Sequence, residues 1–244
     1  MNYEQLSKKK KMLDVIRQRP DDVVRKLNEW FCIELTYTSN AIEGNRLSRE
    51  ETALIVEKGL TIAGKSSVEH MEAVNHAAAL DWIYDFAASG QEIKERDILQ
   101  IQHLILKGID NDSGQYRRSP VKISGSAVVL PSPFAVPDLI RDFIEWLRKT
   151  DLHPVELAAE AHYHLVTIHP FTDGNGRSSR LLMNLLLIRN GYPPAIIRTE
   201  DREAYIASLE KAQLFGDKAD YMQLIAEAAE RSLDIYLEAG RIPD

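Results

Sequence analysis

The chain has 244 residues, enough to bury one sizeable core, and 44% of them are hydrophobic, as in water-soluble globular proteins. Its net charge of −7 argues against nucleic acid as a partner, because nucleic-acid binding favours a basic face. The longest apolar run, residues 181–188, is too short to span a bilayer, so no membrane partner is expected, and the polar first residues predict no signal peptide. A single cysteine, Cys32, excludes an intrachain disulfide and fits a cytoplasmic location.

The spacing of apolar residues predicts a chain built almost entirely from helices. Gly44-Asn45 is a typical helix stop, and Ser48 with Glu51 forms a capping box that starts the next helix. No repeat or linker divides the chain, so we expect an N-terminal helical region (1–90) packed with a core (91–244) as one domain. The expected helices cover residues 4–19, 21–43, 49–58, 66–88, 95–107, 138–149, 154–168, 175–190, 200–213 and 218–238.

The section 110–137 has a different pattern. Two short β-branched runs, 121–123 and 127–130, flank Ser124-Gly125-Ser126, which is typical of a β-hairpin. The prolines that follow would end the hairpin and protect its edge. The predicted fold class is therefore all-α, a helical bundle with one short β-hairpin.

The stretch His169–Arg180, with the sequence HPFTDGNGRSSR, joins two apolar helical patterns. A turn that opens a helix offers unpaired backbone N–H groups and the positive end of the helix dipole, which together bind anions. Asp173 can hold a hard cation such as Mg²⁺, and His169 can accept a proton near neutral pH. The combination predicts a site for a polyphosphate, a metal and a hydroxyl to be activated.

This stretch resembles the signature of the Fic family, H-P-F-x-x-G-N-G-R-x-x-R, at every specified position. Fic proteins are mostly adenylyltransferases that move AMP from ATP onto a hydroxyl of a target protein, so the resemblance implies a Fic-type bundle that uses ATP and Mg²⁺. It implies that His169 deprotonates a target Ser, Thr or Tyr and that Asp173 binds Mg²⁺. Glycine at 176, where phosphotransferring members carry lysine, favours nucleotidyl transfer. The residues assigned to the ATP phosphates are Gly174, Asn175, Gly176, Arg177 and Arg180.

A second stretch, Ser39–Gly44, resembles the family's inhibitory motif, [S/T]-x-x-x-E-[G/N]. In the family this glutamate, here Glu43, pairs with the second arginine of the signature, here Arg180, and occupies the place of the γ-phosphate. The resemblance therefore implies an inhibitory helix over about 21–45 with Ser39 and Glu43 as regulatory residues. Taken alone, the same residues also fit an ordinary helix C-terminus.

Two further segments carry weaker resemblances. Residues 114–133 follow the order of the family's flap, which pairs with an extended segment of the target; a plain surface hairpin is the alternative. The flap residues that this implies are Lys122, Ile123, Ser124, Gly125 and Val128. In the family a tyrosine and an asparagine line the adenine pocket. Tyr205 matches the tyrosine, whereas Gln213 stands in place of the asparagine, with one extra residue before Gly216-Asp217.

Two other patterns have simpler interpretations. The sequence Gly59–Ser66 satisfies the Walker A pattern, but it follows a predicted helix, whereas a phosphate-binding loop of that type follows a strand. We therefore expect an ordinary loop there. The histidines show no metal-binding spacing, and His162 and His164 lie on different helix faces, so core or capping positions are expected.

The resulting hypothesis is a protein adenylyltransferase that uses ATP and Mg²⁺, modifies a hydroxyl-bearing protein or itself, and is inhibited by Glu43. Removal of AMP from a modified protein is the first alternative, and Glu43 would then position a water molecule. The second is a non-catalytic nucleotide-sensing module in which helix 21–43 moves when ATP binds. The sequence is compatible with a homo-oligomer as well as with a monomer.

Overall fold

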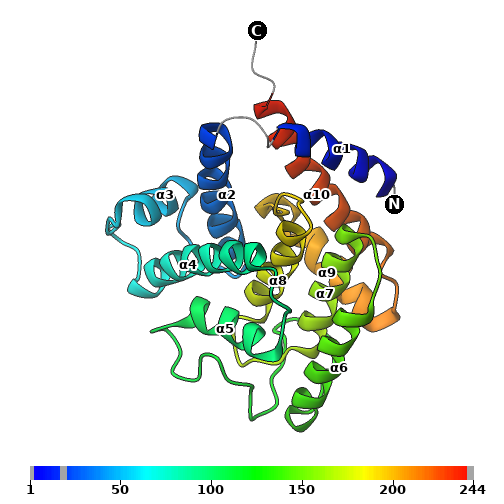
Figure 1. Ribbon diagram of the computed structural model, residues 1–244. Helices are drawn as coiled ribbons and strands as arrows, with labels where there is room; N and C mark the ends of the chain where they lie inside the picture. Colours follow the sequence, from blue (N-terminus) through cyan, green and yellow to red (C-terminus); the bar gives the residue numbers. More distant parts are fainter. Residues whose placement is uncertain (1–2, 17–20, 241–244) are drawn as a thin grey trace.

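The computed structural model describes residues 3–16 and 21–240, and within these ranges it is an assembly of α-helices without β-strands (Figure 1). The predicted helices are confirmed, with ends within two residues, except that the expected end of the first helix lies among residues 17–20, outside the described residues. The helices are α1 (Tyr3–Ile16), α2 (Asp21–Ile42), α3 (Arg49–Lys58), α4 (Ser67–Ser89), α5 (Glu95–Leu106), α6 (Val136–Lys149), α7 (Pro154–Ile168), α8 (Asn175–Arg189), α9 (Arg202–Phe215) and α10 (Ala219–Ala239), with short 3-10 turns η1 (Pro133–Ala135) and η2 (Thr199–Asp201).

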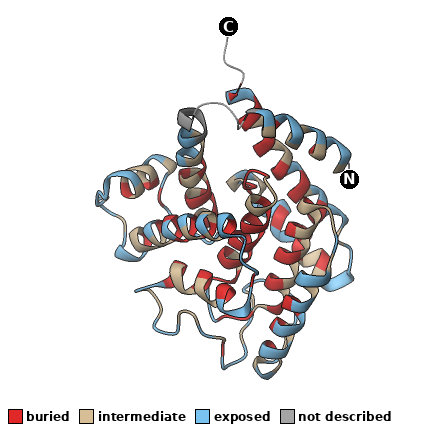
Figure 2. Cartoon of the chain, viewed as in Figure 1, coloured by how far each residue is buried: buried red, intermediate tan, exposed pale blue. Residues whose placement is uncertain are grey.

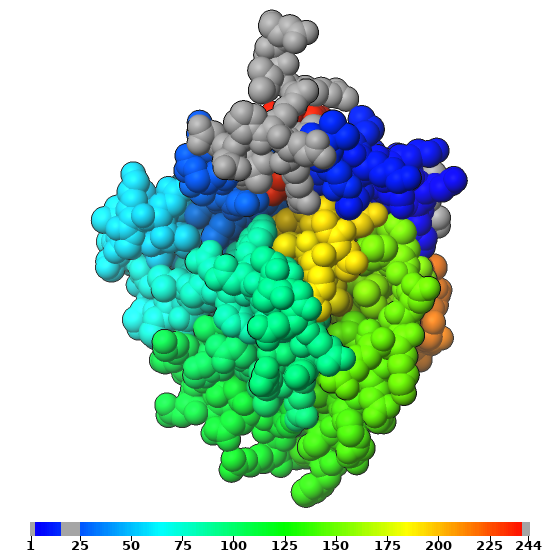
Figure 3. Space-filling model, in the orientation of Figure 1, coloured from blue at the N-terminus to red at the C-terminus, as the bar shows by residue number. Residues whose placement is uncertain are grey.

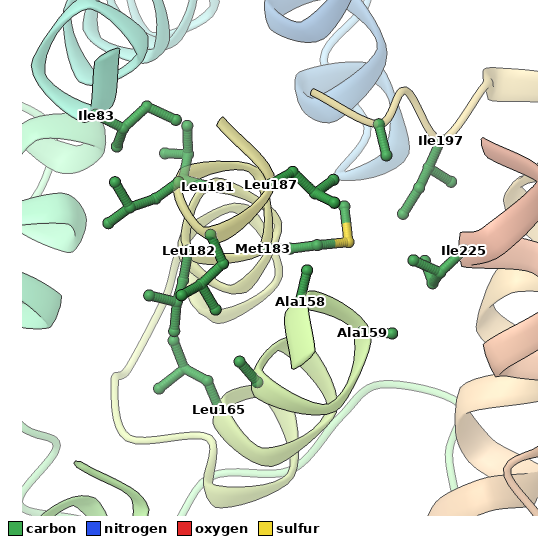
Figure 4. Packing of buried hydrophobic residues seen from close by; sticks show 14 of the residues in the cluster. Ile83, Ala158, Ala159, Leu165, Leu181, Leu182, Met183, Leu187, Ile197 and Ile225 are labelled. Atoms are coloured by element: carbon green, nitrogen blue, oxygen red, sulfur yellow. The ribbon is translucent and has the colours of Figure 1, made fainter. Parts of the chain in front are cut away.

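Helix α8 is the centre of the bundle. Its residues from 177 to 187 are all buried, and its most extensive neighbours are α7 and α4. Figure 4 shows Leu181 and Met183 of α8 among apolar side chains that include Ile83 of α4, Leu165 of α7 and Ile225 of α10. A helix that is buried on all sides is held rigidly by the core. The loop that opens α8 therefore rests on a firmly packed element.

Helices from both ends of the chain contribute to this one core. Figure 2 shows the buried residues on the inward faces of the helices and the exposed residues on the outside. Helix α1 packs on α10, and α2 packs on α4 and α3. In the space-filling view of Figure 3, a yellow portion of α8 reaches the surface between green segments. No helix in residues 3–16 and 21–240 has the length and apolar character needed to cross a membrane.

The Walker-like segment is an ordinary loop, as expected. Helix α3, not a strand, precedes it and ends at Gly59 in the left-handed conformation (φ 63°). Lys65 binds the carboxylate of Glu51 at 2.9 Å, and Ser66 caps α4 with Glu69. The lysine that would hold phosphate in a P-loop instead connects this loop to the start of α3.

The predicted β-hairpin is not formed as a hydrogen-bonded ladder. The only backbone bond across its turn joins Ser126 N to Ile123 O at 3.2 Å. The turn is held from outside, because Glu210 of α9 accepts hydrogen bonds from the Ser126 hydroxyl (2.7 Å) and the Ala127 amide (3.0 Å). Burial still alternates along both arms, as in extended chain. An isolated two-stranded hairpin is marginally stable, and here the carboxylate of Glu210 replaces the cross-strand bonds.

Candidate active site

His169 lies at the C-terminal end of α7 in a strained backbone conformation. Its φ of 51° and ψ of 58° are left-handed, and among the described residues it is the one non-glycine residue with positive φ. Such a conformation costs about 1–3 kcal/mol and persists where the surroundings hold it. Here the carbonyl of His169 accepts a hydrogen bond from Arg117 Nε at 2.8 Å. The strain thus coincides with the predicted catalytic residue.

The hydrogen bonding of His169 determines which ring nitrogen can act as a base. Nδ1 lies 3.2 Å from the carbonyl oxygen of Val166, and because a carbonyl only accepts, Nδ1 carries the hydrogen. Nε2 of the neutral ring therefore keeps its lone pair. Burial lowers the pKa of His169 below its usual 6.5, outweighing the bond to Val166, which raises it. The ring is neutral at pH 7 and can take a proton at Nε2.

The loop between His169 and α8 is shaped for the approach of an anion. Gly174 begins the helix at φ 79°, and a side chain there would lie 3.0 Å from Ile105. The side chain of Asn175 fixes the loop, because it accepts from Phe171 N and donates to Phe171 O, both at 2.9 Å. The first N–H groups of α8 have no partner within the helix and point out of its end. Gly174, Asn175 and Gly176 thus lie at a helix start of the kind that binds anions, and phosphate binding by them stays a prediction.

The predicted pairing of Glu43 with Arg180 is present. Arg180 donates to the Glu43 carboxylate at 2.7 Å, to the Ser39 hydroxyl at 3.0 Å and to the Ser39 carbonyl at 2.9 Å. A Cβ on Gly176 would lie 2.4 Å from the Glu43 carboxylate, so this carboxylate rests against the backbone at the start of α8. Burial acts to raise the pKa of Glu43, but Arg180 and two further arginines lower it overall, so the carboxylate is charged at neutral pH.

The end of α2 that carries Glu43 is anchored by three side chains. Arg202 of α9 donates to the carbonyl of Ile42 at 2.8 Å. Asn40 donates to the carbonyl of Glu72 at 3.2 Å, and Asn45 donates to the carboxylate of Glu72 at 2.9 Å. Sequence reasoning missed these contacts, since only the packing of α4 and α9 brings Glu72 and Arg202 to the end of α2. Glu43 therefore projects from a fixed turn.

Arg177 is buried beside two carboxylates. One of its terminal nitrogens donates to Glu72 at 2.7 Å and the other to Asp173 at 3.3 Å, while its Nε is buried without a hydrogen-bond partner. The second oxygen of Glu72 binds Asn45. Glu72 therefore contacts both the turn that carries Glu43 and the predicted phosphate-binding arginine. Sequence reasoning did not identify Glu72, because an acidic residue on a helix carries no motif.

Asp173 supplies the carboxylate of this loop, and its side chain is accessible. Its side chain is 65% exposed, and it accepts from Gly174 N at 2.6 Å. Within the described residues no cluster of three or more His, Cys, Asp or Glu could hold a metal by itself. Mg²⁺ bound to nucleotide phosphates usually takes only one or two carboxylates, with phosphates and water as its other ligands. An exposed carboxylate at an anion-binding helix start fits that requirement.

Tyr205 and Gln213 lie on α9 in different surroundings. Tyr205 is buried, and its hydroxyl lies 2.8 Å from Nε2 of His162, whose Nδ1 is 2.9 Å from the Tyr221 hydroxyl. Burial lowers the pKa of His162 to about 3, which confirms it as a neutral core histidine. Gln213 is half-buried and donates to Thr167 at 3.1 Å. Contact of Tyr205 and Gln213 with adenine stays a prediction.

The flap segment, defined here as residues 118–130, is largely at the surface. Lys122, Ser124 and Gly125 are exposed, whereas Ile123 and Val128 are half-buried. The segment is joined to the catalytic loop at its base, where residue 117 donates from its backbone amide to the carbonyl of residue 170 at 2.9 Å. Its role in target docking also stays a prediction.

Comparison with known proteins agrees with this geometry. The family model described as Fic/DOC matches residues 92–187. A solved part of Fic-1 from C. elegans is 34% identical, with a TM-score of 0.85, and the alignment covers 97% of this chain and 71% of that one. The chain belongs to the Fic/DOC family.

Other Fic proteins show similarity over nearly the whole chain. A Fic domain containing signaling protein from Bacteroides thetaiotaomicron has a TM-score of 0.87 at 28% identity, covering 99% of this chain and 98% of that one. The protein adenylyltransferase Fic of Aedes aegypti is 39% identical over 242 residues, covering 97% of this chain and 48% of its own length. The chain thus spans about half the length of the curated relatives it matches.

Proposed function

We propose that this Fic protein is an adenylyltransferase, which moves AMP from ATP to a Ser, Thr or Tyr hydroxyl of a protein. The observation that carries the proposal is the placement of a neutral histidine, with Nε2 free, beside a helix start that also holds two buried arginines. Relatives at 38–40% identity are named protein adenylyltransferase Fic, which supports the same reaction.

In this proposal His169 Nε2 accepts the proton of the target hydroxyl. The hydroxyl oxygen then forms a bond to the α-phosphorus of ATP, the bond from that phosphorus to the bridging oxygen breaks, and pyrophosphate leaves. The backbone of Gly174, Asn175 and Gly176, with the N–H groups that open α8, and the side chain of Arg177 would stabilise the negative charge on the phosphates. Such preorganised donors are the main protein contribution to transfer reactions of phosphate groups.

Asp173 would hold Mg²⁺, which neutralises phosphate charge when it is bound. Its exposed carboxylate supports this role. Arg177, next to it, holds the carboxylate in place before nucleotide arrives. Arg180 would bind the γ-phosphate once Glu43 has left.

The flap segment would present the target. Its extended arms and exposed backbone support pairing with an extended target segment, in the manner of strand addition. Lys122, Ile123, Ser124, Gly125 and Val128 would line that contact. Because strand addition depends on the main chain, we expect affinity with little sequence selectivity.

Glu43 would inhibit this reaction by occupying Arg180. The Glu43→Gly variant, called the activated variant below, tests the proposal: with Mg²⁺ and ATP labelled at the α-phosphate it should label itself more than the wild type. A charge-assisted hydrogen bond contributes about 1.5–3 kcal/mol, so competent ATP binding should rise about tenfold to a hundredfold. Adding His169→Ala should abolish the labelling. Glu227→Gln, on the exposed side of α10, should behave as wild type.

Two alternatives give other outcomes. If Glu43 positions water for removal of AMP, the activated variant gains transfer but loses removal from a modified protein; the charged state of the carboxylate is compatible with this role. If the chain only senses nucleotide, ATP binds without turnover in the wild type, the activated variant and His169→Ala alike. Mass spectrometry of the protein after incubation with mixed nucleotides distinguishes these cases.

A further inference from the structure

Arg117 joins the flap segment to the loop that carries His169. Its backbone amide donates to the carbonyl of Pro170 at 2.9 Å, and its side-chain Nε donates to the carbonyl of His169 at 2.8 Å. A terminal nitrogen of the same guanidinium donates to the carbonyl of Pro131 at 2.6 Å. One residue thus holds both ends of the flap segment against the catalytic loop.

The surroundings of Arg117 are unusual for a buried cation. Arg117 is 3% exposed, and its three guanidinium nitrogens donate to backbone carbonyls, those of His169, Pro131 and Ser119. Burial lowers the pKa of this guanidinium, which reflects the cost of placing a charge there. A planar guanidinium binds carbonyls from three separate nitrogens in fixed directions, whereas a lysine has all its donors on one nitrogen at the end of a flexible chain.

We propose that Arg117 is a positioning residue, which fixes the backbone of His169 and the base of the flap in one arrangement. The left-handed backbone of His169 directs the imidazole, and the Arg117 bond falls on the carbonyl of that same residue. The flap segment leaves from Arg117 and returns at Pro131. The target hydroxyl and Nε2 of His169 are thereby placed relative to each other. This inference rests on the function proposed above.

Arg117 also contributes to the electrostatics of His169. Burial and the Arg117 charge lower the pKa of the imidazole, whereas the bond to Val166 and the charges of Glu43 and Asp173 raise it. A neutral residue at position 117 should therefore raise the pKa of His169. A lysine at position 117 would keep the positive charge but lose the planar guanidinium that binds the three carbonyls.

The experiment uses the activated variant as background and compares Arg117→Lys with Arg117→Gln. Both should lower the labelling rate by about a hundredfold, the size expected when reacting groups are misplaced by about 1 Å. ATP affinity measured by calorimetry should stay the same, since the phosphate-binding residues are untouched. In rate–pH profiles the acid limb should move to higher pH for Arg117→Gln only. Arg148→Gln, at a surface ion pair of α6, is the control.

Flap anchoring has its own readout. A lysine-specific protease should cut after Lys122 faster in Arg117→Gln than in the background protein. Unchanged labelling in both variants overturns the proposal, as does a loss of ATP affinity in step with labelling, which would mean a purely structural role. If the background protein does not label itself, the proposed function fails, while the cleavage rate still tests the anchoring.

Discussion

Replacing Glu72 by glutamine tests whether one carboxylate holds both Arg177 and the turn that carries Glu43. One of its oxygens accepts from Arg177 at 2.7 Å and the other from Asn45 at 2.9 Å. A glutamine amide keeps one acceptor, so one of the two donors loses its partner. A hydrogen bond to a charged group contributes about 1.5–3 kcal/mol, which corresponds to about tenfold to a hundredfold in affinity. We expect the affinity for ATP to fall by this factor, because a neutral amide no longer holds Arg177 toward the phosphates as the carboxylate does.

The assay compares ATP with adenosine in the activated variant, where Glu43 does not compete. Affinity for ATP should fall by the factor given above, while affinity for adenosine, which has no phosphates, should not change. Glu227→Gln, at an exposed side chain that accepts a hydrogen bond from its neighbour Gln223 on α10, is the matched control. An unchanged ratio of ATP to adenosine affinity in Glu72→Gln would refute the role of this carboxylate.

Three further predictions concern His169, Gly174 and the core histidines. Labelling by the activated variant should fall as pH decreases, with a midpoint below pH 6.5, because burial lowers the pKa of His169. Initial labelling rates measured across pH give this midpoint, and a value above 6.5 contradicts the prediction. Gly174→Ala should reduce stability in urea denaturation by about 1–2 kcal/mol, because φ is 79° there; an unchanged midpoint would mean that the loop relaxes. His162 and His76, whose pKa values burial lowers to about 3, bind protons more readily when unfolded, so stability should fall as pH decreases from about 6.5 toward 3. His162→Gln should weaken that dependence.

The sequence predicted the parts of this protein that depend on local patterns. Helical periodicity and caps such as the Ser48–Glu51 box predicted the helices and their ends, because each of these signals lies within a few residues. The pairing of Glu43 with Arg180, 137 residues apart, followed from a motif that resembles those of related proteins. Spacing alone could not have given that contact, since it depends on how α2 packs over α8.

The missed residues have in common that tertiary packing gives them their role. Glu72 and Arg202 act through partners on other helices, and nothing next to them in the chain marks them. Arg117 lies in the segment that resembles the family's flap, but its bonds to the carbonyls of His169 and Pro131 could not be read from that resemblance. The flap was predicted as a hairpin because two short β-branched runs flank Ser124-Gly125-Ser126. Extended arms did form, but Glu210 from α9 binds the donors at the turn, a contact between positions 84 residues apart.

In the proposed function, the geometry around Arg180 favours Glu43 as an anion that a phosphate can replace. Arg180 has a side chain that is 6% exposed, whereas that of Glu43 is 37% exposed, so Glu43 is the partner that can leave. A buried guanidinium without an anion is costly, so Arg180 favours a negative partner whether or not ATP is present. Arg202 and Asn45 hold the end of α2, and Ser39 still binds Arg180 when Glu43 turns away, so we expect a phosphate to take the place of the Glu43 carboxylate without a shift of the helix. This favours displacement of Glu43 by nucleotide over a movement of the whole of α2.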